Sequence, residues 1–147
     1  MKSRTRARSL ALQVLYEVDV SNHPPAEVFK ERLEETPLTD ELAEFARQII
    51  FGVIPLIKVL DQIISEYAPE WPLEQIAAID RNILRQACWE FASPDGETPI
   101  KVAINEAVEL AKLFGSDSAP RFVNGVLGSL AEHQQELRFS LQQESSG

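Results

Sequence analysis

Apolar residues recur at three- and four-residue steps along most of this chain, and that spacing predicts amphipathic α-helices. A first helix is expected over residues 4–18, with an apolar stripe made of Ala7, Leu10, Ala11, Val14, Leu15 and Val18. After Pro24 and Pro25 a short helix is expected over 26–35, and Thr39 is placed to cap the next one. No alternating strand pattern of useful length occurs, so the sequence predicts an all-α fold.

The longest apolar pattern covers residues 42–67 in unbroken helical register. Pro55 lacks the N–H that would bond back to Phe51, and Gly52 lies close by. The long helix is therefore expected to kink or break near these residues. A short helical turn is expected to follow over 73–79.

Capping signals divide the second half of the chain. Asp80 is expected to cap a helix over 81–91. Thr98 as cap and Pro99 as first helical residue predict a further helix, which stops at Gly115. With these elements the fold is expected to hold about seven helices.

A last helix is expected over about 118–137, so residues 1–137 form a single domain. Residues 138–147 are polar, and this tail is expected to fray. Gly125 and Gly128 each cost about 1 kcal/mol relative to alanine inside a helix. Their presence favours the close approach of another backbone, from a neighbouring helix or from a partner.

Length and cysteine content favour an ordinary globular domain. A chain of 147 residues buries one core without a disulfide, and its one cysteine, Cys88, excludes an internal disulfide. Gln13 and Glu17 interrupt the N-terminal apolar run, and the run 49–57 is well below the roughly 20 residues that cross a bilayer. We therefore expect a cytoplasmic protein without a membrane-spanning segment.

Charge is distributed unevenly along this acidic chain. The net charge is −9, yet four cations precede the first acid, Glu17; they are Lys2, Arg4, Arg6 and Arg8. The residues after Tyr16 hold ten basic and all 23 acidic side chains, a net charge of −13. Cations at a helix N-terminus oppose the helix dipole, so an external anion such as RNA phosphate explains this arm better than solvation alone.

Candidate catalytic groups do not converge in the sequence. His23 and His133 have no partners at metal-ligand spacing, and Cys88 falls on an apolar stripe. The glycines follow no strand and form no phosphate loop. We therefore predict no enzyme activity, metal or cofactor.

Two polar–aromatic pairs are candidates for base contacts. Tyr16 can stack an unpaired base and Gln13 can bind a base edge, although Tyr16 can equally pack at the rim of the core. Arg121 beside Phe122 forms a second possible stacking pair at the start of the last helix.

Four blocks of sequence, spread from Arg4 to Leu130, carry the strongest signal. They are Arg6-Ala7-Arg8 with Ala11, Gln13, Leu15 and Tyr16; Ile79 to Arg85 with Glu90; Pro99 to Lys112 with Phe114-Gly115; and Arg121 to Leu127. In this order the blocks resemble the NusB family of bacterial antitermination factors.

The resemblance implies a helical fold of two subdomains that share a core. It also implies binding to the boxA element of nascent ribosomal RNA together with the small-subunit ribosomal protein NusE, within the elongating RNA polymerase complex. By position, the RNA-facing residues would be Arg4, Arg6, Arg8, Gln13, Tyr16, Arg121, Phe122 and Asn124. The NusE-facing residues would be Asp80, Arg81, Arg85 and Asp117.

Two alternatives are weighed against this function. The N-terminal domain of ribosomal RNA cytosine methyltransferases shares these blocks, but no residues remain here for the α/β cofactor domain that such an enzyme needs. The other alternative is a helical protein–protein adaptor of the transcription complex in which RNA binding is incidental.

Overall fold

The computed structural model describes residues 2–70 and 73–146, and within them every regular element is helical. The α-helices are α1 (Ser3–Ser21), α2 (Pro25–Glu35), α3 (Asp40–Val53), α4 (Ile57–Tyr67), α5 (Ala78–Ala92), α6 (Ile100–Phe114), α7 (Ala119–Ala131) and α8 (Gln134–Ser146). Two 3₁₀ turns, Ile54–Leu56 and Leu73–Gln75, join them. The predicted all-α fold is confirmed.

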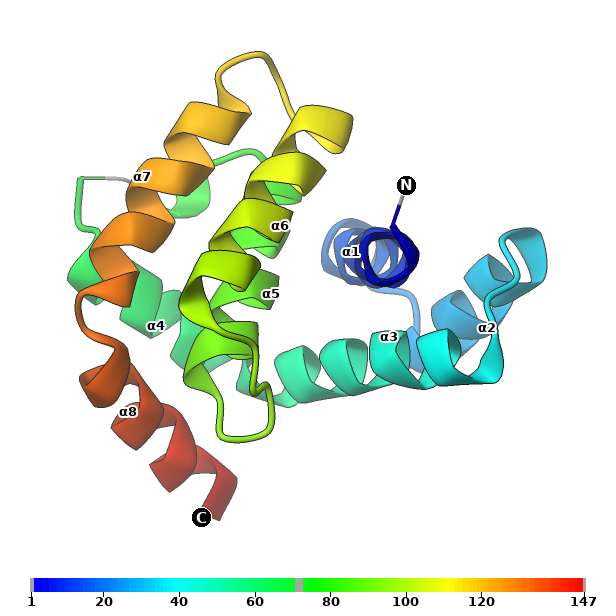
Figure 1. Ribbon diagram of the computed structural model, residues 1–147, viewed down its shortest axis with the longest axis horizontal. Helices are drawn as coiled ribbons and strands as arrows, with labels where there is room; N and C mark the ends of the chain where they lie inside the picture. Colours follow the sequence, from blue (N-terminus) through cyan, green and yellow to red (C-terminus); the bar gives the residue numbers. More distant parts are fainter. Residues whose placement is uncertain (1, 71–72, 147) are drawn as a thin grey trace.

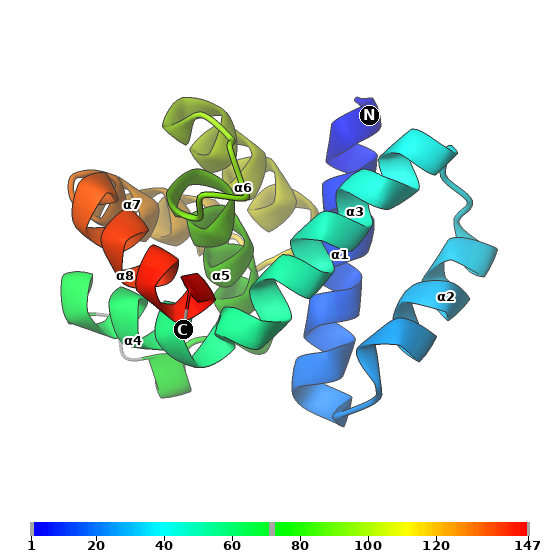
Figure 2. The ribbon, with the colours of Figure 1, turned by 90° about the horizontal axis from the view of Figure 1, so that it is seen from below.

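The helices form two groups that meet along α5 (Figures 1 and 2). Helices α1, α2 and α3 pack together on one side, and α4 to α8 form the other group. Helix α5 contacts α1 and α3 from the first group and α4, α6, α7 and α8 from the second. Their buried apolar side chains form one continuous cluster, as expected for two subdomains with a shared core.

Some helix ends agree with the sequence and others do not. The Thr39 hydroxyl accepts a hydrogen bond from the Leu42 amide at 3.3 Å, so the predicted cap is confirmed. Thr98 is not a cap, because its hydroxyl donates instead to Glu90 Oε1 at 3.1 Å, and the extended Pro99 precedes α6. Asp80 is not a cap either, because it lies inside the first turn of α5.

The predicted break in the long helix is confirmed. Helix α3 ends at Val53, a 3₁₀ turn carries Pro55, and α4 continues from Ile57. The whole stretch Asp40–Tyr67 has 28 residues and a mean hydropathy of 1.6 in its most apolar window, enough by length and composition to cross a membrane. The structure places one apolar face of this stretch in the core, and its residues at most 3% exposed are Ala46, Ile49, Ile50, Val53, Leu60, Ile63 and Ile64.

The C-terminal prediction was wrong in two respects. The expected single last helix is two helices, α7 and α8, and the expected frayed tail is helical as far as Ser146. Leu137 and Leu141 are four residues apart and fully buried, so one face of α8 packs on α4 and α5. Gln134 fixes its start by donating to the Phe91 carbonyl at 2.8 Å.

Glycines also behave differently from expectation. A Cβ at Gly125 or Gly128 would meet no atom within 4 Å, so neither residue permits close packing within the described chain. Gly52, in contrast, does permit close packing, because a Cβ there would overlap the indole ring of Trp89. The side chain of Trp89 is thereby seated directly on the backbone of α3.

Candidate nucleic-acid interface

The four cations at the start of α1 do not form one exposed arm, because Arg8 is buried. Its side chain is 3% exposed, and its Nε donates to both carboxylate oxygens of Glu90, at 2.9 and 3.1 Å. Its Nη1 lies 3.4 Å from Glu106. The prediction that Arg8 faces RNA therefore does not fit the structure, since its guanidinium is taken up by an internal ion pair.

The helical register of α1 explains this burial. Arg8 lies four residues before Leu12 and seven before Leu15, both fully buried or nearly so, and thus belongs to the apolar face of α1. Burial raises the pKa of the Glu90 carboxyl, whereas the hydrogen bonds from Arg8 oppose that rise. The pair is a structural link between α1 and α5.

Arg4 is exposed and, like Arg8, lies over the ring of Phe45 on α3. Its guanidinium carbon lies 4.8 Å from the centroid of the Phe45 ring, a cation–π contact with α3. Beside it, the Thr5 hydroxyl donates to Glu106 at 2.9 and 3.0 Å. Arg4 therefore remains available to solvent from the α3 side of α1.

A separate face of α1 carries polar and aromatic groups at three- and four-residue steps. Its residues are Arg6, Ser9, Gln13 and Tyr16. Lys2 precedes the helix with an extended backbone and lines a different hollow, with Thr5 and Glu106. Lys2 and Arg6 are exposed, and Tyr16 is 38% exposed, so it lies at the edge of the core with part of its ring open to a ligand. Three of the predicted RNA residues, Arg6, Gln13 and Tyr16, thus share one face.

Arg32 on α2 joins this face, although no sequence pattern predicted it. Its Nη1 donates to Gln13 Oε1 at 2.9 Å and its Nη2 to Glu17 Oε1 at 3.1 Å. The other Glu17 oxygen lies 3.0 Å from His23 Nδ1, and the hydrogen bond from His23, followed by that from Arg32, holds the pKa of Glu17 below its usual value. Helix α2 contains four acidic residues around Arg32, so its sequence does not indicate a cationic contact.

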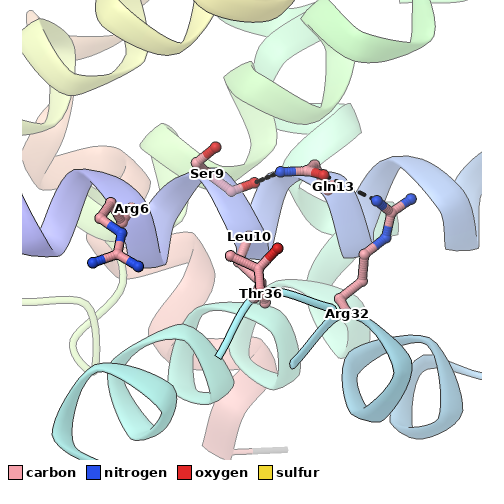
Figure 3. Close-up of a pocket in the computed structure, with 6 residues that line it drawn as sticks. All are labelled: Arg6, Ser9, Leu10, Gln13, Arg32 and Thr36. Carbon is pink, nitrogen blue, oxygen red and sulfur yellow. Dashed lines mark hydrogen bonds between the residues drawn. The ribbon is translucent and has the colours of Figure 1, made fainter. Parts of the chain in front are cut away.

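Figure 3 shows the open pocket that results between α1 and α2. Its volume is about 140 Å³, and it is lined by Arg6, Ser9, Leu10, Gln13, Arg32 and Thr36. Gln13 donates to the Ser9 carbonyl at 3.3 Å while accepting from Arg32, so its amide is held from both sides. An adjoining hollow shares Gln13 and Arg32 and is lined further by Tyr16, Phe114 and the start of α5.

The second predicted RNA group lies elsewhere. Arg121 and Asn124 are exposed on α7, and Phe122 is partly buried against the core. Helix α6 lies between α7 and α1 in both ribbon views (Figures 1 and 2). The structure therefore does not bring Arg121, Phe122 and Asn124 onto the α1 face.

Most residues expected to meet a protein partner are engaged inside the chain. Arg85 is 5% exposed, and its Nε and Nη2 donate to the two oxygens of Asp61 at 2.7 Å each. Arg81 donates to Asp19 at 2.7 and 3.0 Å. The expectation that Arg85 offers its charge to a partner is wrong, because Asp61 already neutralises it.

Asp19 is the centre of this network. Burial alone would raise its pKa, but the hydrogen bonds from Arg81 and Asn82 and the charge of Arg85 lower it below the usual value. The neighbouring Asp80 is 8% exposed, and its buried Oδ1 has no hydrogen-bond partner. Burial raises the pKa of Asp80, which is therefore a poor surface charge, and of the four residues Asp117 alone is classed as exposed.

Catalytic chemistry finds no support among the described residues. They contain no cluster of three or more His, Cys, Asp or Glu side chains able to hold a metal ion. Cys88 is fully buried, and burial raises the pKa of its thiol to about 12, so it is not a nucleophile at neutral pH.

An all-helical chain with a cationic, amide and aromatic face belongs to the class of small helical binding proteins. Within that class, residues 5–132 match the model of the NusB family. The chain belongs to the NusB family.

Relatives agree with this assignment over nearly the whole chain. The transcription antitermination protein NusB of Roseiflexus sp. (strain RS-1) is 47% identical over 136 residues, which cover 92% of this chain and 96% of the relative. The protein of the same name from Chloroflexus aggregans (strain MD-66 / DSM 9485) is 49% identical over 128 residues, 86% of this chain and 85% of the relative.

Solved structures give the same result for the fold. NusB of T. maritima superposes with a TM-score of 0.80 at 30% identity, covering 92% of this chain and 98% of the other. A crystal structure of the antitermination factors NusB and NusE in complex with dsRNA matches with a TM-score of 0.78 at 28% identity, covering 90% of this chain and 98% of the matched one.

Proposed function

We propose that this protein is a non-enzymatic, RNA-binding antitermination factor that acts together with a NusE protein. Its relatives are named as transcription antitermination proteins, and one matching structure holds NusB, NusE and RNA. The observation that carries the proposal is the face of α1 on which Arg6, Gln13 and Tyr16 follow one another at helical spacing. Its target would be the boxA element of ribosomal RNA transcripts, bound in the cytoplasm within the RNA polymerase elongation complex.

Each side chain of this face, together with Lys2 just before the helix, has a distinct task in the proposal. Lys2 and Arg6 contact phosphates and displace counterions. Tyr16 stacks an unpaired base, an interaction worth about 1–3 kcal/mol, and the fixed amide of Gln13 binds a base edge. Arg8 acts indirectly, since its ion pair with Glu90 holds α1 against α5.

The remaining predicted residues define two further surfaces of the proposal. Arg121, Phe122 and Asn124 would contact RNA from α7, separately from the α1 face. For NusE, the exposed Asp117 and the partly exposed Arg81 are the candidates that the structure leaves accessible. The acidic remainder of the molecule would repel RNA and restrict it to these surfaces.

Fluorescence anisotropy with labelled boxA RNA tests the proposal, with and without NusE, over a series of salt concentrations. Lys2→Gln with Arg6→Gln should weaken binding and reduce the salt dependence, because two phosphate contacts are lost. Tyr16→Ala should weaken binding while Tyr16→Phe retains it, since stacking needs only the ring. Arg47→Gln on α3 is the matched control, because it removes an exposed arginine that lines a different hollow, with Trp89 and Asp95.

Unchanged affinity and salt dependence in the Lys2/Arg6 variant would exclude α1 as the RNA site. Pull-down with NusE separates the adaptor alternative. Tight RNA-independent association, with no gain in RNA affinity from the pair, would favour an adaptor over an RNA-binding factor.

A further inference from the structure

The pocket between α1 and α2 has cationic groups at both ends. Arg6 reaches it from α1 and Arg32 from α2, with Ser9, Leu10 and Thr36 between them (Figure 3). None of its lining side chains is a carboxylate. The nearby carboxylate, Glu17, is already engaged by Arg32 and His23.

Arg32 is held in place before any ligand arrives. Its contacts to Gln13 and Glu17 use one N–H from each terminal nitrogen, and a guanidinium carries five N–H donors in a rigid fork. Donors therefore remain for a ligand, and the side chain loses little freedom on binding because it is already ordered. A preorganised arginine of this kind suits a tetrahedral oxyanion.

We propose that this pocket binds a phosphodiester group of the RNA backbone and extends the RNA footprint from α1 onto α2. The inference rests on the proposed RNA-binding function and adds to it the residues Arg32 and Thr36. It makes α2 part of the recognition surface, although that helix is acidic in sequence. Arg32 then has two roles, one as a phosphate contact and one as the group that positions Gln13.

The position of the pocket favours RNA over an acidic peptide. Gln13 and Arg32 form a shared wall between this pocket and the hollow that contains Tyr16 and Phe114. A nucleotide strand alternates phosphates with bases, so a base against Tyr16 would carry its backbone over the Gln13–Arg32 pair toward Arg6. An acidic segment of a protein partner offers charge but no base for the adjoining aromatic hollow.

The test compares Arg32→Gln and Arg32→Lys with Lys30→Gln, a loss of charge on the opposite, exposed side of α2. Binding of boxA RNA is measured by anisotropy over a salt series, with the fold of each variant checked by thermal melting. Arg32→Gln should weaken binding about tenfold, as expected for one charge-assisted hydrogen bond, and should reduce the salt slope by about 0.7. Arg32→Lys should retain the slope because it retains the charge, and Lys30→Gln should change neither quantity.

RNA carrying a neutral methylphosphonate at one linkage at a time provides an independent measure. One position should weaken binding to the parent protein by about the same factor as Arg32→Gln. That position should cause no further loss in Arg32→Gln itself, because the contact is already absent. Arg6→Gln gives the same comparison from the exposed end of the pocket, should Arg32→Gln fail to fold.

Three results would overturn the phosphate subsite while leaving RNA binding by the parent protein intact. The first is an RNA affinity and a salt slope of Arg32→Gln equal to those of Lys30→Gln. The second is equal loss in Arg32→Gln and Arg32→Lys with an unchanged salt slope, which would limit Arg32 to the positioning of Gln13. The third is weakened association of Arg32→Gln with NusE in the absence of RNA, which would assign the pocket to an acidic peptide. No RNA binding by the parent protein, with or without NusE, would instead overturn the proposed function and the subsite together.

Discussion

Arg8→Ala is predicted to destabilise the fold and to affect RNA binding only through that loss. The substitution removes a side chain that is 3% exposed and leaves the Glu90 carboxylate, also 3% exposed, without its counter-charge. Removing one partner of a buried ion pair costs about 3–5 kcal/mol. For a domain of this size, each kcal/mol lowers Tm by about 2–4 °C, so a decrease of about 6–20 °C is expected.

Urea unfolding followed by circular dichroism measures this free energy. Arg6→Ala, two residues away and exposed, is the control and should lie within about 0.5 kcal/mol of the parent. Adding Glu90→Gln to Arg8→Ala should recover part of the loss, because the amide removes the unpaired charge.

The pH dependence provides a second check on the same variant. Burial raises the pKa of Glu90, so its charged form is the costly one in the fold. The loss of unfolding free energy caused by Arg8→Ala should therefore be greatest at neutral pH. It should become smaller as the pH falls through that raised pKa and Glu90 becomes protonated. A variant with unfolding free energy within about 1 kcal/mol of the parent, but with weaker and less salt-dependent RNA binding, would refute the reasoning and return Arg8 to the RNA contacts.

Three further predictions concern stability. Burial alone would raise the pKa of Asp19, but its hydrogen bonds and neighbouring charges bring it below the usual value. The stability that Asp19 contributes is therefore present above the unfolded pKa of about 3.9 and is lost as the pH falls through the lower folded pKa. Asp19→Asn should reduce this loss of stability at acid pH, measured by urea unfolding between pH 6 and 3. Gly52→Ala should cost about 1–3 kcal/mol in thermal melts through overlap with Trp89, whereas Gly125→Ala, facing open space, should gain up to about 1 kcal/mol. Leu141→Ala should cost about 2–5 kcal/mol, and a loss below 1 kcal/mol would mean that α8 does not pack in solution.

Local features of the fold could be predicted from the sequence because they depend on neighbouring residues. The cap at Thr39 and the break at Pro55 each follow from the hydrogen-bonding chemistry of one short segment. The hydrophobic spacing likewise placed the helices through residue 114. The tail failed because it was judged by its polar composition, although Leu137 and Leu141 carry the four-residue spacing of a buried face.

The candidate site was less predictable because its partners come from distant helices. Arg8 has one local signal, its register with Leu12 and Leu15, but the carboxylate that neutralises it is 82 residues away. Arg85 is similar, since Asp61 and Asp19 reach it from other helices. Arg32 gives no local signal at all, because its place beside Gln13 depends on how α2 folds back against α1. Charge can be counted in a sequence, but its exposure is a tertiary property.

The ion pair of Arg8 also has a consequence for the order of events during synthesis. Helix α1 leaves the ribosome well before the partners of its buried polar groups, Glu90 and Glu106, which follow 82 residues after Arg8 and 101 residues after Thr5. At about 5–20 residues per second, this delay is on the order of 5–20 s. The helix that carries the proposed RNA face therefore waits for α5 and α6 before its buried polar groups are paired, and only then is it held in its final position.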